Sequence, residues 1–285
     1  MSPIYRGIYK AGQALRKRHY KLFRAIVENP LVRSIIQRVY GSRIVSVQTP
    51  ESYTLAINPV YHGNFLTTQS ILQYEPEMRA LFENEVSAGM VVYDIGANVG
   101  VFSLQFCQIV GEHGQVYAFE PEENNLRCLL QTKVSNKLSN LEVHEKGVGQ
   151  YTENLFFDRR GGAMSGRVVD SGSENTENVT QMQVISVDDF VYSQGGRPPS
   201  LMKIDVEGNE VKVIDGALRT LEEHHPIIIC ELHHSIEPAV IVIYDVLSKL
   251  GYQCFDVDGH KPNKDEPLDS FVNVHHFIAF ANRTA

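Results

Sequence analysis

The sequence predicts a doubly wound α/β fold, in which a mainly parallel sheet is covered by helices on both faces. From residue 91 onward, short apolar runs alternate with stretches of helical periodicity, the pattern of strand-helix-strand units. We expect helices after the first, second, fourth and fifth strands. The expected strands are 91–94, 115–119, 141–145, 201–205 and 227–231, with a terminal pair at 252–257 and 272–281. Ligands bind beyond the carboxyl ends of strands in such sheets, so residues at those ends are candidates for a functional site.

A basic extension is expected before this sheet. Apolar residues recur at helical spacing through residues 4–28 with Arg and Lys between them, and Pro30 and Gly41 delimit a second short helix. We assign residues 1–42 to this helical extension and 43–285 to the main domain, which opens with a strand pair near 44–57 and a helix near 77–84. The extension fits a lid on the main domain, a membrane-surface segment, or a docking segment for an acidic partner.

Charge is distributed unevenly along the chain. Residues 1–50 hold ten Lys and Arg against one acidic residue, a net charge of +9, whereas the whole chain carries −8 and the remainder therefore −17. An acidic body binds nucleic acid poorly, because that affinity comes mainly from neutralising phosphates. We therefore expect no nucleic-acid substrate.

The location expected from the sequence is cytoplasmic. No run of eighteen apolar residues and no secretory leader pattern is found, which leaves peripheral membrane contact through residues 1–28 as the alternative. The four cysteines, Cys107, Cys128, Cys230 and Cys254, lie far apart without a CxxC pair. They are predicted to be reduced core thiols rather than zinc ligands or disulfides.

The segment DIGANVG at 94–100 predicts a cofactor loop between a buried strand and a helix. A carboxylate at the strand end, Asp94, would repel a pyrophosphate, and the glycine spacing is not the GxGxxG of dinucleotide sites. S-adenosylmethionine has no phosphate and carries an ammonium and a sulfonium, so Asp94 would attract it. Glu120, at the end of the next strand, is placed to accept hydrogen bonds from ribose hydroxyls.

A second group of polar residues follows the fourth and fifth strands. Asp205 ends the first of these, and Glu231 and His233 end the second. Because parallel strands end at one edge, we expect these side chains to gather there. Our hypothesis is that Asp205, or His233 beside it, acts as a general base while Glu231 orients the acceptor or the base. An alternative hypothesis is a divalent cation, magnesium or calcium, bound by Asp205, Glu207 and Glu231.

Residues 146–200 interrupt the alternation and are expected to form an insertion. The segment 161–179 is rich in Gly, Ser, Asn and Glu, and strand-like stretches at 154–157 and 181–185 flank it. Insertions of this kind in α/β enzymes often serve as substrate lids.

Several motifs together resemble the FkbM family of S-adenosylmethionine-dependent methyltransferases, over about residues 85–235. They are DIGANVG at 94–100, FEP at 119–121, VDDF at 187–190, KIDVEGNE at 203–210, GAL at 216–218 and CELH at 230–233. The resemblance implies a class I methyltransferase fold, a Rossmann-like seven-stranded sheet flanked by helices, and O-methylation of natural-product or sugar hydroxyls. It also implies cofactor contacts for Asp94, Gly96, Asn98, Gly100 and Glu120. Lys146-Gly147-Val148-Gly149 stands where many relatives have AVG, so the contact on the adenine side is unassigned.

The sequence therefore predicts an S-adenosylmethionine-dependent O-methyltransferase acting on a hydroxyl of a small molecule, sugar or glycan. The alternative is an S-adenosylmethionine-binding module that has lost its activity and is recruited to a membrane or partner by its basic extension. A nicotinamide-dependent oxidoreductase is disfavoured by Asp94 and by the absence of GxGxxG.

Overall fold

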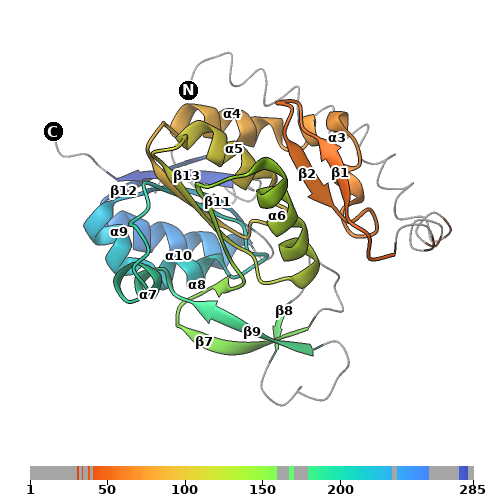
Figure 1. Cartoon of the computed structure of the whole chain (residues 1–285). Helices are drawn as coiled ribbons and strands as arrows, with labels where there is room; N and C mark the ends of the chain where they lie inside the picture. Colours follow the sequence, from red (N-terminus) through yellow and green to blue (C-terminus); the bar gives the residue numbers. More distant parts are fainter. Residues whose placement is uncertain are drawn as a thin grey trace.

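A central sheet of seven strands forms the body of the protein (Figure 1). The computed structural model describes residues 41–158, 167–169, 179–232, 236–256 and 276–281, together with Leu31, Ser34 and Arg38. The strand order is β12-β13-β11-β10-β3-β4-β5. Their bounds are β3 Val91–Ile95, β4 Gln115–Phe119, β5 Leu141–His144, β10 Leu201–Ile204, β11 Ile227–Glu231, β12 Tyr252–Asp256 and β13 His276–Ala281. All seven expected strands are confirmed, the last of them over 276–281, since residues 272–275 lie outside the described residues.

The sheet is doubly wound, as the sequence predicts. The chain enters at β3, moves outward through β4 and β5, and then returns so that β10 pairs with the other side of β3. These strands and β11 are parallel, whereas β13 runs antiparallel to both β11 and β12. The order reverses between β3 and β10, which is where open α/β sheets bind their ligands.

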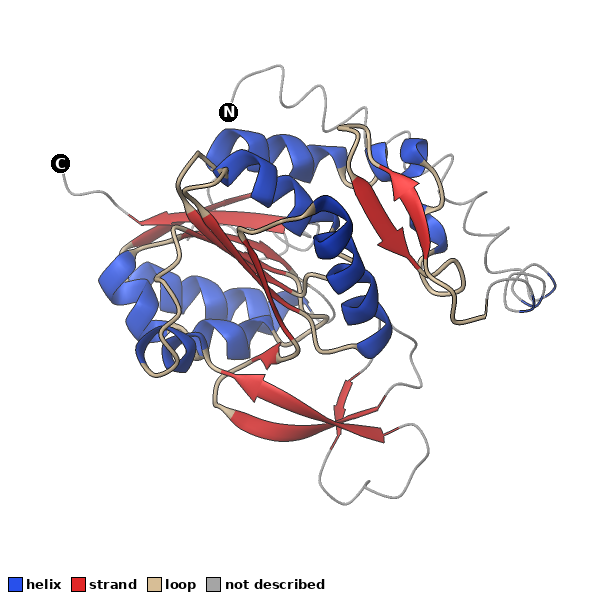
Figure 2. Ribbon diagram, in the orientation of Figure 1, coloured by secondary structure: helices blue, strands red, loops and turns tan. Residues whose placement is uncertain are grey.

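Helices cover both faces of this sheet (Figure 2). One face packs against α7 Val187–Tyr192, α8 Glu210–Asp215, α9 Leu218–His224 and α10 Ile236–Lys249. The other packs against α4 Pro76–Glu85, α5 Val101–Val110 and α6 Glu123–Asn136. Side chains alternate along each strand, so Tyr93 and Ile95 join the first core and Val92 joins the second. By the same alternation Asp94 points towards α5, beside its registered neighbour Lys203.

The segment before the sheet packs on α6. It contains the hairpin β1 Val45–Gln48 and β2 Thr54–Ile57, followed by the 3-10 helix η1 Gly63–Phe65 and α3 Thr68–Leu72. Two side chains of α6 satisfy the edge of β2: Asn136 Oδ1 accepts from the Thr54 amide at 2.8 Å, and Thr132 Oγ1 accepts from the Ala56 amide at 3.0 Å. Figure 1 shows the hairpin alongside α6.

The expected strand pair near 44–57 and helix near 77–84 are confirmed. The expected helix at 4–28 lies outside the described residues, and of the second helix Leu31, Ser34 and Arg38 are described as helical. Within the described ranges, no helix has both the length and the apolar character needed to cross a bilayer.

The insertion forms a second sheet of four strands in the order β6-β9-β7-β8. Its strands are β6 Gly147–Val148, β7 Glu153–Asp158, β8 Arg167–Val169 and β9 Val179–Ile185. The strand-like stretches at 154–157 and 181–185 are therefore confirmed, and most of 161–179 lies outside the described residues. Its role as a substrate lid stays a prediction.

The four cysteines are buried and free, as expected for core thiols. Burial raises the pKa of the Cys128 thiol to about 11 and raises those of the other three further. These groups therefore stay protonated at neutral pH and are poor metal ligands or nucleophiles.

Candidate active site

The turn from β3 to α5 lies directly against the end of β10. Gly96 and Gly100 have φ values of 79° and 88°, and Asn98 between them has 52°, so the loop is built from left-handed residues. A Cβ on Gly96 would lie 1.8 Å from the backbone oxygen of Asp205. The Asp205 amide donates to the Ile95 carbonyl at 3.0 Å. Two motifs that are more than a hundred residues apart in the chain therefore meet through their backbones.

Glu120 lies at the carboxyl end of β4 and is buried, with its carboxylate turned towards this loop. Its Oε2 accepts from the Asn98 amide at 2.8 Å, and Oε1 accepts from the Glu122 amide at 2.8 Å and from Asn125 Nδ2 at 3.3 Å. Burial raises the pKa of Glu120 to about 7; the three hydrogen bonds oppose this shift and the nearby charge of Glu122 adds to it. Among described residues Oε2 accepts one hydrogen bond, so a lone pair remains for a ribose hydroxyl.

Asp94 is fully buried and paired within the protein. Its Oδ2 accepts from Ser103 Oγ at 2.5 Å, and its Oδ1 lies 3.3 Å from Lys203 Nζ. From the sequence, the positive partner of Asp94 was expected to be the cofactor, whereas the structure supplies Lys203. Direct contact between Asp94 and a cofactor stays a prediction.

Lys203 connects the β3–α5 turn with Asp205 at the end of β10. It was not among the site residues expected from the sequence. Its Nζ donates to the Gly96 carbonyl at 3.1 Å and lies 3.3 Å from Asp205 Oδ2. Burial lowers the pKa of Lys203, but the charges of Asp94 and Asp205 outweigh burial and raise it overall. The ammonium therefore stays charged. The available signal was a Lys inside an otherwise apolar strand, which is uncommon unless the charge is paired.

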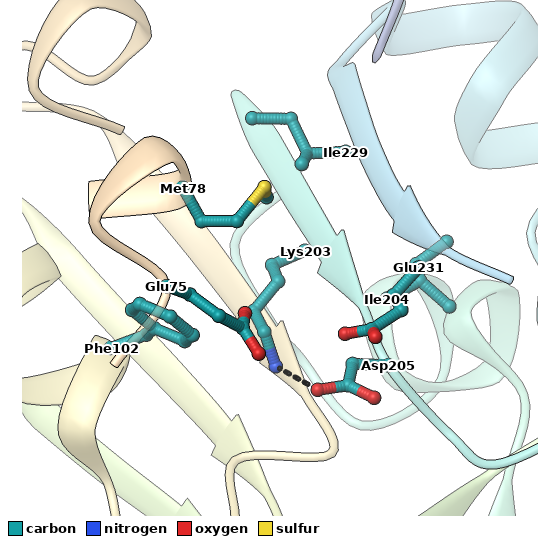
Figure 3. A pocket seen from close by; sticks show the side chains of 8 residues that line it. All are labelled: Glu75, Met78, Phe102, Lys203, Ile204, Asp205, Ile229 and Glu231. Carbon is teal, nitrogen blue, oxygen red and sulfur yellow. Dashed lines mark hydrogen bonds and ion pairs between the residues drawn. The ribbon is translucent and has the colours of Figure 1, made fainter. Parts of the chain in front are cut away.

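Asp205 and Glu231 share a pocket at the ends of β10 and β11 (Figure 3). In Figure 3 their carboxylates lie close together and Lys203 reaches towards Asp205. The side chain of Asp205 is 21% exposed, so the carboxylate is accessible while still held by Lys203. The lining residues are Glu75, Met78, Phe102, Lys203, Ile204, Asp205, Ile229 and Glu231. The pocket is small, well below the roughly 300 Å³ of a typical whole-ligand site.

His233, the third member of the expected catalytic group, lies outside the described residues. Glu207, expected only in the metal alternative, is exposed, has a left-handed φ of 53° and does not line this pocket. Glu75 and Met78, which reach the pocket from the start of α4, were not expected from the sequence. Nothing in the sequence near residue 75 marks it as part of a site formed by residues 94–231.

The metal alternative is not supported. In the described part of the chain, no group of three or more His, Cys, Asp or Glu side chains is arranged to hold a metal ion. The physical reason lies in the surroundings of Asp205, where the Lys203 ammonium provides the positive charge at 3.3 Å. The magnesium or calcium site of Asp205, Glu207 and Glu231 considered from the sequence is therefore unsupported by the described residues.

Comparison with known proteins decides the family. The model of the methyltransferase FkbM domain matches residues 94–254, more than half of the chain. The chain belongs to the FkbM family of methyltransferases. Its seven-stranded sheet is the one expected of class I methyltransferases, so the fold predicted from the sequence is confirmed.

Three individual proteins illustrate the similarity. The hexuronic acid methyltransferase AglP of Haloferax volcanii is 26% identical over 196 residues, which cover 68% of this chain and 75% of that protein. The crystal structure of the methyltransferase FkbM from Methylobacillus flagellatus KT has 18% identity and a TM-score of 0.45, covering 75% of this chain. This chain spans 53% of that one. An S-adenosylmethionine-dependent O-methyltransferase from Thermotoga maritima has 13% identity and a TM-score of 0.42, covering 72% of this chain and 65% of that one.

Family membership implies S-adenosylmethionine as the cofactor, and the site fits it. The loop of Gly96, Asn98 and Gly100 and the carboxylate of Glu120 meet at the reversal point of the sheet. A buried carboxylate with a remaining acceptor position suits ribose hydroxyls and would repel a phosphate. The individual cofactor contacts of Asp94, Gly96, Asn98, Gly100 and Glu120 stay predictions.

Proposed function

We propose that this protein transfers a methyl group from S-adenosylmethionine to a hydroxyl group of a sugar or glycan. The observation that carries the proposal is the direct contact between the cofactor loop and the acceptor pocket. Gly96 lies against the backbone of Asp205, whose carboxylate opens into the pocket at the ends of β10 and β11. A methyl donor and an acceptor must lie within about 3 Å of each other for in-line transfer, which this contact favours.

Each half of the site has a distinct role in the proposed reaction. S-adenosylmethionine, when bound, supplies a methyl group activated by its sulfonium. Glu120 holds the ribose hydroxyls through its carboxylate, and the glycine turn lets the backbone approach the cofactor closely. Asp205 and Glu231 face the acceptor in the neighbouring pocket.

Asp205 is the proposed general base. A sugar hydroxyl is a weak nucleophile until its proton is being removed, and a carboxylate within hydrogen-bond reach performs that step. Lys203 at 3.3 Å keeps Asp205 in the carboxylate form that can accept a proton. Glu231 orients the acceptor through a second hydroxyl. His233 stays an alternative base predicted from the sequence alone.

The relative and the chemistry of the pocket both support the proposed acceptor class. AglP is named for hexuronic acid, a sugar with both hydroxyl and carboxylate oxygens. A carboxylate oxygen is already a nucleophile and needs no base, whereas a hydroxyl does. The carboxylates of Asp205 and Glu231 in the pocket also repel an anionic group. Both considerations favour a hydroxyl acceptor over a carboxylate acceptor.

The test is transfer of a labelled methyl group from S-adenosylmethionine to a panel of neutral hexoses, hexuronic acids and oligosaccharides. The proposal predicts labelled products that survive mild alkali, because methyl ethers are stable and methyl esters hydrolyse. Alkali-labile label would contradict a hydroxyl acceptor while leaving methyl transfer intact. Absence of any labelled sugar, with S-adenosylhomocysteine still bound, would place the acceptor in another chemical class.

A further inference from the structure

A buried histidine of the N-terminal segment connects to Glu120 through hydrogen bonds. His62 lies between β2 and η1 and is 2% exposed. Its Nδ1 accepts from the Asn58 amide at 3.0 Å, so in the neutral ring the proton must be on Nε2. Nε2 lies 2.8 Å from Asn125 Oδ1, to which it therefore donates. The backbone of Asn58 thus determines the tautomer of His62.

The orientation of the Asn125 amide follows from this tautomer. Since Oδ1 accepts from His62, Nδ2 is on the side of Glu120 and donates to its Oε1 at 3.3 Å. A flipped Asn125 amide would place its NH2 donors against the His62 Nε2–H donor. It would also place its Oδ1 against the Glu120 carboxylate, and both contacts would be repulsive. The chain of contacts His62, Asn125, Glu120 is buried at every member.

We propose that His62 is a positioning residue for the cofactor site, where its neutral imidazole fixes the Asn125 amide as a hydrogen-bond donor to the Glu120 carboxylate. The ribose contact of Glu120 rests on the proposed function, whereas the relay itself rests on the hydrogen bonds above. His62 lies outside residues 94–254, the part matched by the family model. The N-terminal segment therefore completes a site whose other members come from the family domain.

The charged and titratable groups around Glu120 determine in which direction its pKa moves when the contact with Asn125 is lost. Glu122 is the neighbouring charge and raises the pKa of Glu120, while His144 of β5 contributes its backbone oxygen to the Glu120 amide. Burial lowers the pKa of His62, which keeps the ring neutral at pH 7. Cys128 Sγ lies 3.8 Å from His62 Nδ1 and stays a protonated thiol. Removing the Asn125 donor takes away a hydrogen bond to the carboxylate, so the pKa of Glu120 rises.

A matched pair of variants separates the relay from packing. His62→Asn can keep an acceptor near the Asn58 amide but is too short to reach Asn125, whereas His62→Gln places an amide nitrogen near the position of Nε2. Cys128→Ala changes packing beside the ring without touching the relay. Asn125→Ala removes the Nδ2 group that donates to Glu120. It therefore tests the same contact with Glu120 if His62→Asn fails to fold.

The first measurement is a carboxyl-carbon NMR titration of Glu120, whose resonance is identified by its loss in Glu120→Gln. The expected result is an upward shift of the Glu120 midpoint in His62→Asn and in Asn125→Ala, with His62→Gln and Cys128→Ala matching the wild type. The second measurement is the affinity for S-adenosylhomocysteine against pH. At pH 7 we expect His62→Asn to bind roughly three- to tenfold more weakly than wild type, with the difference disappearing at pH 9.

Two outcomes overturn the inference, and they differ from failure of the proposed function. An unchanged Glu120 midpoint in both His62→Asn and Asn125→Ala overturns the relay, even where the wild type binds S-adenosylhomocysteine. If the Glu120 midpoint shifts equally in His62→Asn and His62→Gln and both variants fold normally, the assignment of His62 Nε2–H as the donor to Asn125 is overturned. Absence of S-adenosylhomocysteine binding in wild type at every pH overturns the proposed function and, with it, the cofactor role of the relay.

Discussion

Glu120 is a buried carboxyl group whose charge changes close to neutral pH. Its pKa is raised to about 7 by burial, so at pH 6 most molecules carry the protonated form. In the proposed cofactor site, ribose hydroxyls donate to the carboxylate, so the ionised form of Glu120 is expected to bind the nucleoside and the affinity to rise with pH. We expect the affinity for S-adenosylhomocysteine to increase about tenfold between pH 6 and pH 8, measured by calorimetry.

The control for this pH dependence is Glu120→Gln, which has no titrating group at this position. It should bind more weakly at pH 8 and show a nearly flat profile from pH 6 to pH 8. A wild-type profile that is flat, or that falls as pH rises, would contradict the assignment of Glu120 to the ribose.

Asp205 allows a test of catalysis apart from cofactor binding. Asp205→Asn preserves the shape of the side chain and the backbone contact with Gly96 but removes the proton acceptor. We expect turnover to fall by about 10²- to 10⁴-fold, the usual contribution of a general base, with cofactor affinity changed less than about threefold. Turnover close to that of wild type would remove Asp205 from the base role and direct attention to His233.

At the scale of elements, the turn between β3 and α5 is tied to the end of β10. Gly96→Ala would place a Cβ 1.8 Å from the Asp205 carbonyl oxygen, and because both atoms belong to backbone or are fixed to it, the two strands must move apart. Gly89 is a matched control, since its φ of 83° is close to the 79° of Gly96. Apart from its two chain neighbours, no atom of the described residues lies within 4 Å of the place where its Cβ would sit.

We expect Gly89→Ala to lower the free energy of unfolding by about 1 kcal/mol through backbone strain alone. Gly96→Ala should cost at least about 2 kcal/mol more, because overpacking adds to the same strain. Denaturant unfolding of the two variants beside wild type measures the difference. Equal losses would show that the close approach of the turn to β10 is not maintained in solution.

The elements most clearly marked in the sequence were also the ones predicted correctly. Buried parallel strands such as Val91–Ile95 and Ile227–Glu231 begin with runs of three or four apolar residues, so they stand out without any tertiary information. By contrast, β6 has two residues and depends on pairing with β9, and α3 and α7 are one to two turns long. Such short elements carry too little periodicity to be recognised.

The VDDF motif illustrates a residue whose role needed the structure. Asp188 accepts hydrogen bonds from the Arg219 and Thr220 amides at 3.0 and 2.8 Å, and so caps the start of α9. Nothing in the sequence relates position 188 to position 219. Lys203 was missed for a similar reason, since its meaning depends on the registered neighbour Asp94 across the sheet.

At the scale of the whole molecule, the uneven distribution of charge leads to a prediction about the basic extension. Residues 1–50 carry a net charge of +9 and the remainder −17, so charge attraction favours docking of the extension on the main domain. If the extension is a lid, reversing Arg16, Lys17 and Arg18 to Glu should lower kcat/KM several-fold and leave binding to anionic liposomes unchanged.

The paired measurement is liposome co-sedimentation of the wild type and the charge-reversed variant. Intact turnover together with loss of liposome binding would contradict the lid and identify the extension as a membrane address. It would also favour the alternative in which recruitment, rather than catalysis, is the principal role of the protein.

The central claim, that the site between β3, β4 and β10 binds S-adenosylmethionine, is tested most directly by calorimetric titration. Wild type and Glu120→Ala are each titrated at pH 8 with S-adenosylhomocysteine and, as a control, with NADH. We predict micromolar binding of S-adenosylhomocysteine to wild type, clear weakening in Glu120→Ala and no binding of NADH. Absence of S-adenosylhomocysteine binding, or equal binding in both proteins, would contradict the claim.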